Sequence, residues 1–256
     1  MLKNLFFYLL AALPLLTVGQ KTDSLSYKSS DFKLSINTNQ EEGIQPIELS
    51  ISSVLFTDTI IGSSINKLIN HKLYSYNNDS LNCNGFAFAA SFLANYGDFL
   101  KDFPDNPMNW SIDKKAKVIL NNQKLVTIEF FEFSYEGGAH PNTSFTLMML
   151  DPQNAKEIHL EDILIPGSYQ PLVKLCERYL RLSRNISGKA NLEEEGFWLD
   201  KGALPLAENI ALSNTGLRVI YNSYEIAPYA MGQSDFTIPY SELSKILKPE
   251  ILPYQK

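Results

Sequence analysis

Apolar side chains recur at every second position in several segments of the N-terminal half of the chain. These segments cover residues 30–38, 45–55, 110–120, 125–135 and 144–150. Because successive side chains of a strand point to opposite faces of a sheet, this period of two predicts strands. Asn121 and Asn122 lie between the third and fourth segments and favour a tight turn, so we expect an antiparallel meander.

Helical spacing replaces this alternation between the second and third predicted strands. Asp58 can cap a first helix, and residues 85–103 form a second apolar-faced segment that Pro104 ends. The stripe of the first helix consists of Ile61, Ile65, Leu68, Ile69 and Leu73. We expect both helices to pack on the sheet, because the run of apolar residues within 128–133 suggests a strand covered on both faces.

The second half of the chain predicts shorter elements. Residues 170–184 carry an apolar stripe at helical spacing, and a final helix is expected at residues 242–247 behind Ser241. Short strands are expected at residues 196–199, 209–212, 217–221 and 235–239. The pattern therefore predicts an α+β fold, with an antiparallel sheet meander and packed helices over residues 30–155. A second, smaller α+β subdomain follows over residues 156–250.

Residues 1–19 bear on the cellular compartment. They hold one cation, Lys3, then an apolar run over residues 5–16 and small residues before Gln20, as a secretory signal peptide does. A single N-terminal membrane anchor is the alternative interpretation, but the run is shorter than the roughly 20 residues that span a bilayer. We therefore expect an exported protein, periplasmic or extracellular, with no transmembrane segment once the signal is removed.

Composition and charge limit the class of partner. Hydrophobic residues make up 45% of the chain and charged residues 20%, as in a globular protein with a buried core. The net charge is −6, and loss of Lys3 with the signal makes it more negative. This balance argues against nucleic acid, whose phosphates require a basic surface. A basic partner fits the charge, although acidity also serves solubility.

Cys83 and Cys176 are the only cysteines of the chain. An even number in an exported protein permits one disulfide between them. Two separate buried thiols are the alternative, because cysteine is among the most frequently buried residue types. The sequence leaves both interpretations open.

Motifs for catalysis are missing from the sequence. His71, His140 and His159 are not spaced as helix neighbours, and neither cysteine lies near one of them, so we expect no metal site. Neither a Gly-x-Ser-x-Gly elbow nor a phosphate-binding glycine loop occurs, and we expect no cofactor and no catalytic residue. A pair of carboxylates that meet only in space stays open as a route to glycan hydrolysis.

The segment Tyr221–Tyr240 is the first candidate for binding, because it gathers tyrosines around a proline and a glycine. Its candidate binding residues are Tyr224, Glu225, Pro228 and Tyr229. Exposed tyrosines supply large contact areas in protein interfaces. Core packing of the loop by the same tyrosines is the alternative.

A second candidate is the segment Ser134–Asn142, which contains the pair Gly137-Gly138. Glycines accept backbone angles that other residues avoid, so the pair can present neighbouring side chains to a ligand. The side chains concerned are those of Tyr135, Glu136 and His140. A wide turn whose glycines satisfy geometry alone is the alternative.

Both segments resemble signatures of one bacterial family. Tyr135-x-Gly137-Gly138-Ala139-His140-Pro141, followed by Ile158-His159-Leu160-Glu161-Asp162-Ile163, resembles its central signature. Tyr224-Glu225-Ile226-Ala227-Pro228-Tyr229-Ala230-x-Gly232 and Ile238-Pro239-Tyr240-Ser241-Glu242-Leu243 resemble its C-terminal signature. The family is a pair of exported domains of unknown function, found as the extracellular region of the anti-sigma-V factor and as the accessory N-terminal region of peptidoglycan deacetylase C.

The resemblance spans residues 34–247 and implies two α+β subdomains. Because the anti-sigma-V relative binds lysozyme with this region, it implies a basic, lysozyme-type muramidase as a partner, with peptidoglycan as the alternative partner. We therefore expect a secreted or periplasmic, non-catalytic binding protein of the bacterial cell envelope. A cell-wall glycan-binding or glycan-modifying protein, acting through Glu136 and His140 or through an unseen carboxylate pair, is the alternative function.

Overall fold

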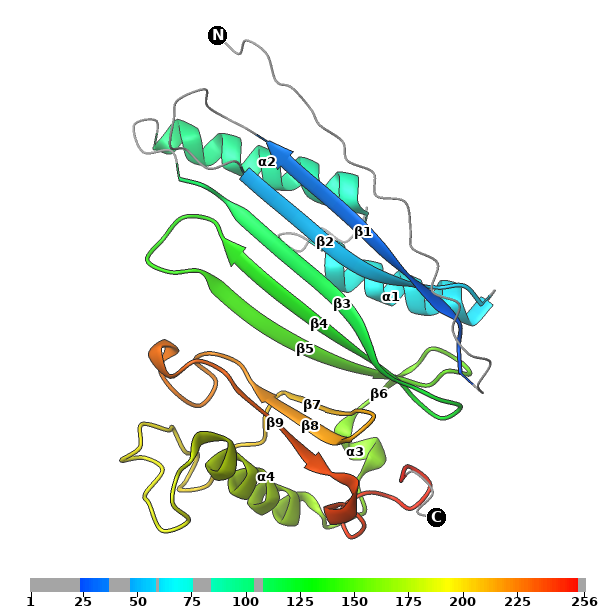
Figure 1. Ribbon diagram of the computed structural model, residues 1–256, viewed down its shortest axis with the longest axis vertical. Coiled ribbons are helices and arrows are strands. Elements are labelled where there is room, and N and C mark those ends of the chain that lie inside the picture. The colour runs from blue at the N-terminus through cyan, green and yellow to red at the C-terminus, as the bar shows by residue number, and fades with distance from the viewer. Residues whose placement is uncertain (1–23, 37–46, 59, 76–83, 104–107, 253–256) are drawn as a thin grey trace. The chain divides into compact units, whose positions relative to one another are not determined.

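Two β-sheets with packed helices make up the protein (Figure 1), and the expected α+β class is confirmed. The computed structural model describes residues 24–36, 47–58, 60–75, 84–103 and 108–252. The segment expected to be a signal, residues 1–19, lies outside these ranges.

The larger sheet has six strands in the order β1-β2-β3-β4-β5-β6. Their bounds are β1 Tyr27–Ile36, β2 Ile47–Phe56, β3 Ser111–Asn121, β4 Val126–Tyr135, β5 Asn142–Leu150 and β6 Glu157–Ile158. β1 and β2 are antiparallel, but β2 and β3 run parallel, so the sheet departs at this pair from the purely antiparallel meander expected. The reason is the long helical connection between β2 and β3, since parallel neighbours need a crossover of this kind.

Two helices form the crossover, α1 (Ile60–Tyr74) and α2 (Gly85–Asp102). α1 packs on β2 and buries Ile65 and Ile69 completely. α2 begins after Asn84, whose side-chain oxygen accepts the first free backbone N–H groups of the helix. The stripe predicted for α1 is confirmed at Ile65, Ile69 and Leu73, whereas Leu68 is exposed. The buried face of α2 consists of Phe88, Ala89, Phe92 and Tyr96.

The smaller sheet has three antiparallel strands in the order β7-β8-β9. The elements of this region are α3 Leu160–Ile163, α4 Tyr169–Arg184, β7 Asn209–Leu212, β8 Gly216–Tyr221, η1 Tyr229–Met231, β9 Ser234–Pro239 and η2 Tyr240–Glu242. α4 packs on β9, and its apolar stripe, with Leu172, Cys176 and Leu180, is fully buried. These side chains share one hydrophobic core with Val219 and Tyr221 of β8.

The sequence-based predictions of two short elements are wrong. Residues 196–199 form no strand, and residues 242–247 form turns rather than a helix. Pairing with a distant segment explains the second case, because the N–H of Ile165 donates to the carbonyl of Ile246, and the N–H of Lys248 donates to that of Ile163. These bonds hold the chain in a short antiparallel bridge, which a helix cannot form.

The chain folds as two compact units, and each is assembled from two stretches. The first unit comprises the described residues of Met1–Lys117 and Phe130–Thr143. The second comprises those of Val118–Glu129 and Ser144–Lys256, so the connected ends of β3 and β4 group with the C-terminal elements. The subdomain division expected between residues 155 and 156 stays a prediction.

Candidate binding loop

The aromatic loop, defined as residues 222–232, joins β8 to β9 and contains the tyrosines singled out by the sequence. Tyr224 is 55% exposed and Pro228 is exposed, whereas Tyr229 is half-buried. The rings of Tyr224 and Tyr229 pack at a tilt, with centroids 5.7 Å apart. Tyr224 has φ +69°, a left-handed conformation that costs a non-glycine residue roughly 1–2 kcal/mol. An exposed aromatic residue kept in a strained conformation is typical of a functional position.

Arg184, at the end of α4, fixes the second half of the aromatic loop. Its guanidinium donates hydrogen bonds to the carbonyls of Met231, Gly232 and Gln233 at 2.8, 3.2 and 2.6 Å. It also donates to the hydroxyl of Ser234, where β9 begins. A planar guanidinium with several donors is suited to holding successive carbonyls in one arrangement. One side chain therefore sets the path of the backbone after Tyr229.

Glu225 and Asn222 fix the first half of the loop. The carboxylate of Glu225 accepts the backbone N–H groups of Glu208 and Asn222, each at 2.8 Å. The side-chain amide of Asn222 in turn accepts the N–H of Phe145 at 2.8 Å and donates to the Phe145 carbonyl at 2.9 Å. Burial raises the pKa of Glu225 above its usual value, and the two N–H donors oppose this shift. Glu225 thus acts as a clamp on the loop in this structure.

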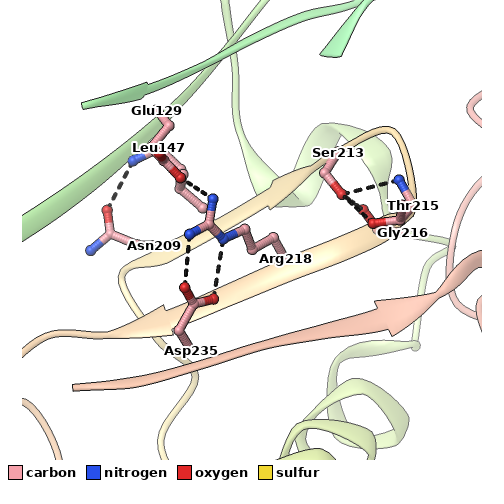
Figure 2. A network of polar contacts seen from close by, with 8 residues as sticks. All are labelled: Glu129, Leu147, Asn209, Ser213, Thr215, Gly216, Arg218 and Asp235. Carbon is pink, nitrogen blue, oxygen red and sulfur yellow. Dashed lines mark hydrogen bonds and ion pairs between the residues drawn. The ribbon is translucent and has the colours of Figure 1, made fainter. Parts of the chain in front are cut away.

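The strands that carry the loop are joined by a charge network (Figure 2). Arg218 of β8 makes a two-bond contact with Asp235 of β9, at 3.1 and 2.7 Å, and an ion pair with Glu129 of β4. The side chains of Arg218 and Glu129 are largely buried, so water screens this pair less than a surface pair. Asn209 of β7 also accepts the N–H of Leu147 from β5 at 3.1 Å. The aromatic loop is therefore mounted on strands that are held by polar contacts on both sides.

The glycine loop, defined as residues 134–142, joins β4 to β5 and contains the second group of candidate residues. The hydroxyl of Tyr135 donates to the carbonyl of Gly138 at 3.2 Å. His140 is exposed, and its Nδ1 lies 2.9 Å from the carbonyl oxygen of Pro141. Glu136 is half-buried. Tyr135 therefore shapes the turn itself, whereas His140 has one face towards solvent.

Gly137 seats the glycine loop on an aromatic cluster of the first unit. It has φ +84°, and a Cβ placed there would lie 3.3 Å from the sulfur of Met108 and 3.6 Å from Nε1 of Trp110. The Trp110 ring packs against those of Tyr96 and Phe99, with centroids 5.4 and 5.3 Å away. A glycine is needed here for both conformation and space.

The structure thus groups the predicted site residues in two places. Tyr224, Glu225, Pro228 and Tyr229 share the aromatic loop of the second unit, and Tyr135, Glu136 and His140 share the glycine loop of the first. Both groups stay predictions as binding sites.

The choice between a Cys83–Cys176 disulfide and two free thiols is not tested, because Cys83 lies outside the described residues. Cys176 is fully buried on α4, and burial raises the pKa of its thiol to about 12. A thiol in this setting is inert towards reagents that need the thiolate.

Comparisons with known proteins match two separate parts of the chain to two families. Residues 28–143 match the family described as deacetylase PdaC, and residues 161–241 match a family of unknown function, DUF3298. The chain pairs a PdaC-like region with a DUF3298-like region. The glycine loop lies in the first region and the aromatic loop in the second.

Solved structures have a similar fold over most of the chain. A DUF3298 family member from Bacteroides fragilis has a TM-score of 0.70 and 20% identity, over 89% of this chain and 96% of that one. A DUF3298 family protein from Pseudomonas aeruginosa PAO1 has a TM-score of 0.66 and 22% identity, over 90% and 98% of the two chains. No curated protein matches the sequence.

Sequence reasoning missed the residues that fix the aromatic loop. Arg184 was not singled out in the sequence, because its partners lie 47 to 50 residues further along the chain. Arg218 lay in an apolar strand pattern as its single charge. A lone charge inside a buried strand is a signal of a buried ion pair, and it could have pointed to Arg218.

Among the residues that the structure describes, no helix has the length and apolar character needed to cross a bilayer. Within the same residues, no three side chains of the His, Cys, Asp and Glu types are grouped so as to hold a metal ion.

Proposed function

We propose that this chain is a non-catalytic binding protein of the bacterial cell envelope, exported to the periplasm or the cell exterior, and that the aromatic loop contacts its partner. The PdaC and DUF3298 matches support an association with the cell envelope. The observation that carries the proposal is Tyr224, an exposed aromatic residue in a strained conformation on a loop clamped by Arg184 and Glu225. A loop fixed before binding loses less entropy when a partner docks.

The partner that we propose is a basic, lysozyme-type muramidase. The chain carries a net charge of −6, which attracts a basic protein and speeds encounter at low salt. Tyr224 and Tyr229 supply the contact area, in the manner of the aromatic residues that dominate many interfaces.

Calorimetric titration with a basic lysozyme, at low and at moderate salt, tests this function. The protein without residues 1–19 is expected to bind at both salt concentrations, and Tyr224→Ala with Tyr229→Ala should weaken binding at least about tenfold. Tyr169→Ala is the matched control, because Tyr169 is a similarly exposed tyrosine at the start of α4. Heat that appears only at low salt would indicate non-specific charge attraction and contradict the proposal.

Cell-wall glycan is the second candidate ligand, and the PdaC match over residues 28–143 favours it. Sedimentation with insoluble peptidoglycan measures binding directly. Release of soluble muropeptides would indicate glycan modification instead, and its loss in Glu136→Gln would assign the reaction to the glycine loop. Full release by that variant would remove Glu136 from the chemistry.

A further inference from the structure

We propose that the binding surface extends from the aromatic loop onto the neighbouring segment Glu193–Trp198, and that this segment receives a basic region of a protein partner. Trp198 is the aromatic anchor, and Glu193, Glu194 and Glu195 are the ion-pair partners. The inference rests on the proposed function of the aromatic loop and adds a second contact to it.

The Glu193–Trp198 segment lies directly against the aromatic loop. The backbone N–H of Trp198 donates to the carbonyl of Ile226 at 2.7 Å. Two residues earlier, a Cβ built on Gly196 would lie 3.0 Å from the sulfur of Met231, so the segment also touches the end of the loop. These two contacts fix residues 196–198 beside the chain that carries Tyr224 and Tyr229.

Trp198 is an unusual residue to leave in water. Its side chain is 47% exposed, whereas its neighbour Phe197 is 2% exposed and belongs to the core. Tryptophan is the side chain that most often anchors a protein interface, because it offers a large apolar area and a face for cations. Trp198 is therefore an exposed aromatic residue bonded to Ile226, which lies two residues along the loop from exposed Tyr224.

The three glutamates before Trp198 are held on an ordered turn. Asn191 accepts the N–H of Glu193 on its side-chain oxygen at 2.9 Å, and the N–H of Gly196 donates to the Glu193 carbonyl at 3.0 Å. Leu192, which is 3% exposed, and Phe197 anchor the two ends of the turn in the core, and a backbone hydrogen bond of 2.9 Å joins them. The carboxylates are thus presented by a fixed backbone.

These carboxylates have no evident use in the fold. All three residues are exposed, and within the described residues none of their side chains forms an ion pair. Neighbouring like charges repel one another, so the run costs stability unless a cation approaches. Lysine and arginine side chains are complementary to both parts of this surface, since they pair with carboxylates and stack on tryptophan. This complementarity selects a basic protein as the occupant.

The test compares two triple variants with the same net charge. Glu193→Gln, Glu194→Gln and Glu195→Gln together remove the charges of the turn, while Glu157→Gln, Glu161→Gln and Glu250→Gln remove three exposed charges elsewhere on the second unit. Association with a basic lysozyme is followed by stopped flow or surface plasmon resonance at several salt concentrations. We expect the first triple to slow association several-fold more than the second and to flatten its salt dependence. Trp198→Ala is expected to speed dissociation about tenfold or more.

The outcomes separate this inference from the proposed function. If lysozyme fails to bind the unaltered protein, the proposed function itself fails. Suppose that lysozyme binds and that Tyr224→Ala weakens binding. If Trp198→Ala then dissociates at the rate of the parent and the two triple variants associate at the same rate, the extended surface is overturned and the aromatic loop is retained as the contact. A Trp198→Ala variant that loses only peptidoglycan binding would also overturn the basic protein as occupant. Thermal melting of each variant verifies that the fold is retained.

Discussion

The aromatic loop and the glycine loop both join neighbouring strands, yet they are fixed by different forces. The aromatic loop is held by side chains from distant elements, with Arg184 bound to its carbonyls and Glu225 bound to backbone N–H groups. Gly137 seats the glycine loop on Met108 and Trp110, where an added Cβ would make a tight contact of 3.3 Å with the sulfur of Met108. One loop depends on polar clamps and the other on a close apolar contact.

This difference predicts how each loop responds to change. Hydrogen bonds of a clamp can be removed one at a time, and each removal loosens the loop without altering the core. A close contact with a tightly packed core has no such graded response, because an added methyl group must displace its neighbours. The clamped loop also exposes Tyr224, so its rigidity serves contact with a partner.

The largest effect is expected from Gly137→Ala. The φ of +84° and the 3.3 Å approach to Met108 should together cost about 3 kcal/mol of unfolding free energy. Gly97→Ala is the control, because Gly97 lies inside α2 with open space around it, and alanine there should be neutral or slightly stabilising. Urea denaturation measures both variants. Equal stability of the two variants would contradict the role assigned to Gly137.

Arg184→Met should have the next largest effect, a loss of about 2 kcal/mol, because four loop acceptors lose a charged donor. Arg181→Met is a matched control, since Arg181 lies on the same helix and donates to the carbonyls of Ser187 and Ala190. Hydrogen exchange should show faster opening of residues 222–233 in the first variant only. Unchanged protection of the loop in Arg184→Met would mean that the clamp is dispensable.

Glu225→Gln should cost about 1 kcal/mol near neutral pH, because an amide offers one acceptor oxygen to two N–H donors. The two hydrogen bonds to the carboxylate are retained at neutral pH. Burial raises the pKa of Glu225 in the folded state, so the part of its contribution that is linked to proton binding is fully present below the unfolded pKa and is lost as the pH rises through the folded pKa. The stability of the parent relative to Glu225→Gln should therefore fall as the pH rises across this window. Urea denaturation of both proteins at a series of pH values checks this prediction. A stability difference between parent and variant that rises with pH would contradict the raised pKa of Glu225.

Tyr224→Gly should have the smallest effect on stability, within about 1 kcal/mol, because glycine accepts the left-handed φ and the tyrosine ring is mostly exposed. The variant removes the candidate contact while keeping the clamps. A melting temperature lowered by more than a few degrees would show that the ring packs the loop.

Much of the fold could be predicted because its signals are local. β7 has the bounds read from the alternating pattern, and α4 begins one residue before the predicted start. The parallel pair β2–β3 could not be read in this way, since strand direction depends on where a crossover returns the chain. The helix expected at residues 242–247 failed because its carbonyl and N–H groups pair with residues 163–165, far away in sequence.

The same distinction between local signals and long-range contacts applies to the candidate site. Tyr224 and Tyr229 could be selected from composition and from the family resemblance, because both lie in one short segment. Arg184 and the contact between Trp198 and Ile226 are long-range and leave no periodic trace in the sequence. Glu225 was selected as a binding residue, and the structure gives it an internal role as a clamp.

Calorimetry of the parent and Tyr224→Gly against a basic lysozyme at moderate salt tests whether the aromatic loop is the contact for a protein partner. We expect saturable binding by the parent and at least about tenfold weaker binding by the variant, with both proteins folded. Equal affinity of the two proteins, or no binding by the parent, would contradict this expectation.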